Sequence, residues 1–135
     1  MPMTRQEKKA HERQKQLAFN KIKKHLVEYE PYFIMDKPFG EWHYRLQFPL
    51  PEKYITRHYD KMSYVWLYID KDCLRFNFLP AMSVYKMLDD APNLSQYFRR
   101  NKIFKFYHTK EVDEKELKKL LKKGFAYFQE SHWLK

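Results

Sequence analysis

The chain has 135 residues and a formal net charge of +10, with three tryptophans, eleven tyrosines and eleven phenylalanines but one cysteine and two glycines. This length predicts a single domain, and Gly40 and Gly124 are too few to form a P-loop or a dinucleotide-binding fingerprint. Because Cys73 is the single cysteine, an internal disulfide and a multi-cysteine zinc site are excluded, and a reduced, cytoplasmic setting is expected. The sequence has no long apolar stretch, so we expect no membrane span and no secretory signal.

The first predicted element is a helix from about residue 5 to residue 29. Its apolar residues recur at spacings of three and four, and they are Phe19, Ile22, Leu26 and Tyr29. Pro31 ends this pattern because proline disfavours a helical conformation at the preceding residue. Residues 1–16 are nearly all polar and have little to bury. We therefore expect a basic N-terminal arm, helical or frayed, followed by a single α+β domain over residues 17–135.

Three strands are predicted next. Residues 41–48 alternate as a strand does, and the face expected to be buried consists of Trp42, Tyr44, Leu46 and Phe48. Residues 63–79 predict a β-hairpin that turns at residues 70–72. The first strand of this hairpin is apolar or aromatic on both faces, which predicts a central position in the sheet. In its second strand the residues that share one face are Leu74, Phe76 and Phe78.

The last third of the chain predicts two helical regions and a strand. The first helical region begins at Pro80 and ends near Pro92, with Met82, Tyr85 and Leu88 at helical spacing, and a short helix can follow within residues 93–100. Residues 103–108 predict a strand. A final helix follows Asp113, whose spacing from Glu116 matches a capping box. Its apolar stripe consists of Leu117, Leu120, Leu121, Phe125 and Phe128.

This order of elements predicts an α+β fold. Runs of strands with helices at both ends favour a mainly antiparallel sheet whose N- and C-terminal helices pack on one face, as a two-layer sandwich.

Several short strings resemble the YjbR/MmcQ-like family of small domains with a frataxin-like fold, and related YdhG-type domains are similar in outline. The resemblance covers about residues 33–130. The matching positions are Asp36, Pro38, Phe39 and Gly40, then Lys61 and Met62, then Asn77 and Pro80, and finally the strand, acidic cap and helix of residues 103–128. The resemblance implies the frataxin-like fold and a DNA-binding label, without catalytic residues to carry over.

Three features depart from the family pattern. The loop over residues 49–61 is longer, the basic arm lies outside the match, and the family's tryptophan in the last strand is replaced by Phe104 or Phe106. We expect the arm to be where this protein's particular function differs from that of its relatives.

Basic residues gather in three groups along the chain. They are Arg5, Lys8, Lys9, Arg13 and Lys15 in the arm; Arg99, Arg100, Lys102 and Lys105 around the last strand; and Lys118, Lys119, Lys122 and Lys123 in the last helix. Such groups create a positive field that attracts polyanions. We interpret them as the phosphate contacts of a non-enzymatic nucleic-acid-binding module. Solvated helix faces made basic for solubility are the simpler alternative.

Some aromatic residues are predicted to point away from the core. Candidates are His43, Tyr64, Tyr68, Phe104 and Tyr107. Aromatic residues interleaved with lysine and arginine on a sheet can stack bases. A second packed face, covered by a helix or by a partner subunit, is favoured over base stacking because large exposed apolar patches are uncommon on monomers. A homodimer interface would account for the same pattern.

The sequence assigns no catalytic residue, metal or cofactor. The six histidines lack ligand spacing, and a turn explains Asp70 and Asp72. Cys73 suits a small buried side chain. Two alternative functions remain: a protein-interaction or regulatory domain that binds an acidic partner or itself, and a binder of a small anionic ligand such as a nucleotide between the sheet and loop 49–61.

Overall fold

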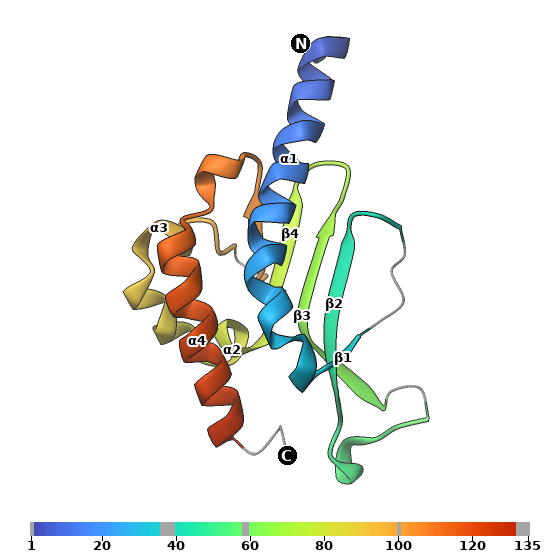
Figure 1. The fold of residues 1–135 in the computed structure, drawn as a ribbon, viewed down its shortest axis with the longest axis vertical. Helices are drawn as coiled ribbons and strands as arrows, with labels where there is room; N and C mark the ends of the chain where they lie inside the picture. The colour runs from blue at the N-terminus through green and yellow to red at the C-terminus, as the bar shows by residue number, and fades with distance from the viewer. Residues whose placement is uncertain (1, 36–39, 58–59, 100, 132–135) are drawn as a thin grey trace.

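A computed structural model of the protein describes residues 2–35, 40–57, 60–99 and 101–131 (Figure 1). A five-stranded antiparallel sheet forms one layer, with its strands in the order of the chain. The strands are β1 (Ile34–Met35), β2 (His43–Pro49), β3 (Lys61–Ile69), β4 (Leu74–Phe78) and β5 (Phe104–Phe106). The predicted α+β class and the central position of β3 are confirmed, whereas the two-residue strand β1 was not predicted.

The helices form the second layer. They are α1 (Arg5–Leu26), α2 (Leu79–Ser83), α3 (Pro92–Ser95) and α4 (Glu114–Glu130). Four short 3₁₀ helices occupy connections along the chain: η1 (Val27–Tyr32), η2 (Glu52–Tyr54), η3 (Tyr85–Asp90) and η4 (Thr109–Glu111). The long helices α1 and α4 lie side by side across one face of the sheet (Figure 1). Apolar residues of α1, α2, η3, α3 and α4 share one buried core with that inner face of the sheet.

Helix α1 is shorter at its C-terminus than predicted. It begins after Thr4, whose hydroxyl accepts a hydrogen bond from the Glu7 amide at 3.1 Å, as an N-cap residue does. The chain turns into η1 after Leu26, and Pro31 lies within that tighter helix. A 3₁₀ turn at a helix terminus accommodates this proline and ends the α-helical stripe one turn early.

The inner face of the sheet carries the predicted strand residues and two residues expected to face outward. Leu74, Phe76 and Phe78 are buried as predicted. Tyr64 and Phe104 are also buried, so these two of the five candidates do not point outward. In β5 the buried residues Phe104 and Phe106 alternate with the half-buried Lys105.

A bulge in β3 explains Tyr64. Leu46 pairs with Val65 while Gln47 pairs with Ser63, so Tyr64 has no residue opposite it in β2. The extra residue reverses the alternation of β3, and both Tyr64 and Val65 are buried.

The predicted helical region after Pro80 is broken into two short pieces, and the short helix predicted to follow it is α3. The backbone of Val84 is non-helical, so α2 ends there and η3 follows as a 3₁₀ helix. As a result Leu88 is buried together with Met87, whereas Tyr85 of the predicted stripe is 68% exposed.

Helix α4 begins as predicted but uses half of the expected capping box. Asp113 Oδ1 accepts a hydrogen bond from the Glu116 amide at 3.1 Å. The Glu116 carboxylate instead accepts from the amides of Asn93 and Leu94, each at 2.9 Å, and so ties α3 to α4. Further along α4, a Cβ atom on Gly124 would lie 2.4 Å from the Phe78 ring. This glycine therefore allows α4 to approach the end of β4 closely.

Candidate nucleic-acid interface

The basic arm forms the first half of α1. Its first turns extend beyond the end of the sheet (Figure 1), and every residue from 2 to 10 is exposed. The exposed cations in this part of the helix are Arg5, Lys8, Lys9 and Arg13. They are available to a polyanion along the projecting helix.

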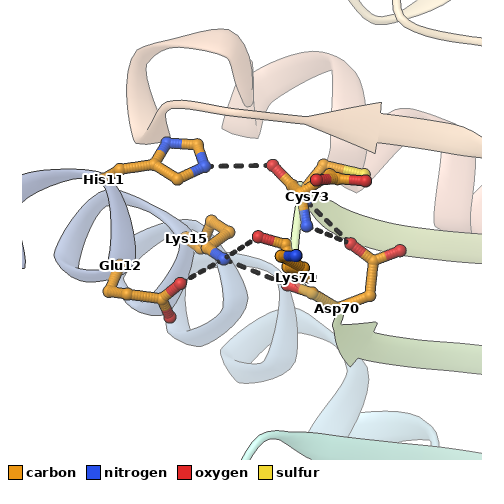
Figure 2. Close-up of polar contacts among 7 residues, drawn as sticks. His11, Glu12, Lys15, Asp70, Lys71 and Cys73 are labelled. Atoms are coloured by element: carbon orange, nitrogen blue, oxygen red, sulfur yellow. Dashed lines mark hydrogen bonds and ion pairs between the residues drawn. The ribbon is translucent and has the colours of Figure 1, made fainter. Parts of the chain in front are cut away.

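Lys15 is placed differently from the rest of the arm. Its side chain is completely buried, and Nζ donates to the carbonyl oxygens of Asp70 at 3.0 Å and Lys71 at 3.1 Å (Figure 2). The Glu12 carboxylate lies 2.5 Å from the same nitrogen. Lys15 therefore holds α1 against the tip of the β3–β4 hairpin and, unlike the other cations of the arm, is not accessible to phosphate.

The hairpin tip is organised by Asp70. Its Oδ1 accepts hydrogen bonds from the amides of Asp72 and Cys73, both at 2.8 Å, and its Oδ2 pairs with the Arg75 guanidinium. Burial opposes ionisation of Asp70, but the two amides and Arg75 outweigh it and lower the pKa of the carboxyl group. The contacts of Asp70 therefore stabilise the turn between β3 and β4, as the sequence predicts.

The second basic group surrounds the turn before β5. The Arg99 amide donates to the Ile103 carbonyl at 2.9 Å, and Lys102 adopts a positive φ of 62° at the turn. Arg99 and Lys102 are exposed at this turn, whereas Arg100 lies outside the described residues. Lys105 is half-buried between Phe104 and Phe106, which both point into the core. Its side chain therefore projects from the outer face of the sheet.

The third basic group covers the solvent side of α4. Its exposed lysines are Lys115, Lys118, Lys119, Lys122 and Lys123. Because α1 and α4 lie side by side, Lys24 and His25 of α1 join three of them around a groove of about 480 Å³. We call the combined surface of these five lysines and Lys24 the basic helical surface.

The electrostatics of the groove are visible at Glu114. Its carboxylate pairs with Lys24 at 2.7 Å and with His25 at 2.9 Å. Their hydrogen bonds lower the pKa of Glu114 to about 2. The surroundings therefore stabilise an anionic group strongly, although Glu114 itself offsets part of the positive charge there. Lys123 is partly offset in the same way by an ion pair with Asp90.

The three predicted groups do not converge on one surface. The helices cover the inner face of the sheet, so the side chains of Lys118, Lys119 and Lys122 lie on the opposite side of the molecule from Lys105. Residues Arg99 and Lys102 lie at a sheet-edge turn. The structure thus separates a helical surface from a sheet surface.

The outer face of the sheet combines aromatic and basic side chains in two cross-strand rows. One row crosses from β2 to β5 and consists of His43, Tyr68, Arg75 and Lys105. The other crosses from β2 to β4 and consists of Arg45, Trp66 and Asn77. Each of these seven residues is partly exposed, in contrast to the buried residues that alternate with them. We call these seven residues the outer sheet face.

Trp66 lies at the centre of the outer sheet face. The Arg45 guanidinium lies 4.9 Å from its ring centroid, and its Nε1 donates to His43 Nε2 at 2.8 Å. The Tyr68 ring lies 5.2 Å away. Tyr68 and His43 were among the predicted outward candidates, whereas Trp66, Arg45 and Arg75 were not predicted as site residues. The alternation of Arg45 and Arg75 with buried residues is the signal that identifies them.

Histidine, cysteine and acidic side chains are the candidates for a metal or reactive site. The described part of the chain holds no group of three or more histidine, cysteine or acidic residues placed to bind a metal ion. His58 and His132 lie outside the described residues. Cys73 is buried, and this burial, with the nearby Asp70 carboxylate, raises the pKa of its thiol.

Comparisons with family models, with curated proteins and with solved structures found no match for this chain. The resemblance to the YjbR/MmcQ-like family therefore stays a prediction, and three of its matching positions, Asp36, Pro38 and Phe39, lie outside the described residues. Among the helices that the structure describes, none is long and apolar enough to cross a membrane.

Proposed function

We propose that the protein is a non-enzymatic module that binds nucleic acid mainly through phosphate contacts. The observation that carries the proposal is the placement of α1 beside α4, which gathers Lys24, Lys118 and Lys119 around one groove. Phosphate contacts by such lysines release counterions from the nucleic acid and make affinity depend steeply on salt. The projecting cations of the arm extend the positive surface along α1.

The carboxylate of Glu114 supports this assignment. An anion that is already stabilised between α1 and α4 indicates that the groove favours negative charge. Lys118 and Lys119 line the groove, Lys122 is exposed further along α4, and all three can follow a phosphate backbone without rearrangement of the core. The DNA-binding label implied by the YjbR/MmcQ-like resemblance agrees with the same function.

A salt-dependent titration tests the proposal. Fluorescence anisotropy with labelled 20-residue single-stranded and duplex DNA and RNA should detect binding at low salt, with affinity falling as salt rises. The double variant Lys118→Glu, Lys122→Glu should weaken binding by about tenfold or more, and should reduce the slope of log K against log salt by about 2. Both lysines are exposed, so the fold should be retained.

The matched control is the double variant Lys53→Glu, Lys61→Glu. It changes the net charge equally at two exposed positions, one in η2 and one at the first residue of β3, neither of which belongs to the basic helical surface. A smaller loss in this control would assign the binding to the basic helical surface. Absence of binding by the wild-type protein at low salt, or binding that does not respond to salt, would refute the proposed function.

A further inference from the structure

The outer sheet face has properties that phosphate binding alone does not require. Its first row crosses four strands, which at about 4.8 Å between strands spans about 14 Å. Trp66 and Tyr68 occupy the central strand, and the row ends in the cations Arg75 and Lys105. Aromatic rings at the centre and cations at the side suit a ligand that has both flat bases and anionic groups.

The ring of Trp66 is held in place before any ligand binds. Its indole N–H is bonded to His43, and Arg45 lies against one part of the ring system. A ring fixed by a hydrogen bond and a cation–π contact loses little conformational freedom when a base stacks on it or on the adjoining guanidinium. Sheets that bind single-stranded RNA present aromatic side chains to bases in this manner.

We propose that the outer sheet face binds unpaired bases of a single-stranded nucleic acid, with Trp66 and Tyr68 as stacking surfaces. Arg45 lies against the Trp66 ring, and Lys105 lies two strands from Tyr68 at the end of the same row, so both can contact phosphates beside the stacked bases, whereas the charge of Arg75 between them is partly offset by Asp70. This inference rests on the proposed function for the class of ligand, but it assigns a second surface and the single-stranded form.

The charge of the outer sheet face favours this ligand over a second copy of the chain. A symmetric dimer through this face would bring Arg45 and Lys105 of both copies into one interface, and such like charges repel. A single strand supplies the opposite charge and exposes its bases. A duplex keeps its bases stacked inside, so it can offer this face its phosphates but few base surfaces.

The test compares a single strand with a duplex of the same length at one low salt concentration. Trp66→Ala should weaken single-strand binding by about tenfold, within the range measured for one stacked base, and should change duplex binding by less than about twofold. Trp66→Phe keeps a ring and should stay closer to wild type. Tyr85→Ala is the matched control, because Tyr85 is 68% exposed on η3 and should affect neither ligand.

The outcomes separate this inference from the proposed function. If the wild type binds both ligands but Trp66→Ala behaves like Tyr85→Ala, the sheet-face inference is overturned while the proposed function stands. If the wild type binds neither ligand at low salt, the proposed function fails and the inference fails with it. A wild-type dimer in light scattering that Trp66→Ala converts to a monomer would identify the face as a self-interface and also overturn the inference.

A second variant provides the same test if Trp66→Ala fails to fold. The circular dichroism melt of Trp66→Ala should remain cooperative, since Trp66 lies outside the buried core. If it does not, Tyr68→Ala removes the neighbouring half-exposed ring and should show the same selective loss of single-strand binding. Equal losses for single strand and duplex in Tyr68→Ala would contradict the inference.

Discussion

The two faces of the same sheet carry aromatic side chains in different surroundings. On the inner face Phe76, Phe78 and Phe104 are buried among apolar residues under the helices. On the outer face Trp66 and Tyr68 stay partly exposed and lie among arginine and lysine. The comparison shows that the aromatic residues of this sheet occupy two different environments. The residues that alternate with the aromatic side chains along each strand distinguish the buried environment from the exposed one.

The largest expected effect is on stability and contrasts the two faces directly. Phe76→Ala removes a fully buried ring and should lower the free energy of unfolding by about 3–5 kcal/mol. Trp66→Ala loses a partly exposed ring and a cation–π contact, and should cost about 1 kcal/mol. Urea denaturation of both variants measures the difference. Similar losses would mean that the outer sheet face is as tightly packed as the core.

The second prediction concerns a cation on the inner side. Lys15→Met keeps an apolar chain of similar length but leaves the carbonyl oxygens of Asp70 and Lys71 without their donor. The free energy of unfolding should fall by about 1–3 kcal/mol. Lys9→Met, at an exposed position of the same helix, is the control and should change it by less than about 0.5 kcal/mol. Equal effects in urea denaturation would show that Lys15 does not fasten α1 to the hairpin.

The third prediction addresses the contact between the layers. Gly124→Ala improves helix propensity, but its methyl group would overlap the buried Phe78 ring. Overpacking outweighs the gain, and we expect a net loss of about 1–2 kcal/mol in the free energy of unfolding. Asn77→Ala, on the outer side of the same strand β4, provides the comparison and should be nearly neutral. A stabilised Gly124→Ala variant would contradict the close approach of α4 to β4.

The sequence predicts the inner face well where alternation is clear. In β4, Arg75 and Asn77 separate three apolar residues, so the buried set is unambiguous. In β3 both faces are apolar or aromatic, and the bulge at Tyr64 depends on the pairing with β2. The burial of Tyr64 therefore could not be obtained from the sequence of β3 alone.

The candidate site depends still more on contacts between distant residues. The sequence does not distinguish Lys15 from the other cations of the arm, because the carbonyl groups that bind it lie 55 and 56 residues away along the chain. Likewise the composition of α4 predicts its basic stripe, but the approach of Lys24 follows from the packing of α1 on α4. Local patterns therefore identified the chemical groups, whereas their division between two surfaces required the fold.

The smallest expected effect concerns the ion pairs that Glu114 forms with Lys24 and His25. The pKa of Glu114 lies at about 2 in the folded protein, below its ordinary value of 4.5, because of Lys24 and His25. A carboxyl group whose pKa is lowered by folding stabilises the folded state above its unfolded pKa, and this contribution is lost as the pH falls from about 4.5 towards 2. The Glu114 side chain is 36% exposed, so solvent screening should keep the contribution within about 1 kcal/mol.

Glu114→Gln should therefore be less stable than wild type at pH 6 by a few tenths to about 1 kcal/mol, and the difference should disappear towards pH 2. Urea denaturation across this pH range measures it, with Glu130→Gln, at the exposed end of α4, as the control. High salt should reduce the difference at pH 6, because exposed ion pairs are screened. A difference that persists unchanged at pH 2 would arise from packing and would remove Glu114 as a reporter of positive potential on the basic helical surface.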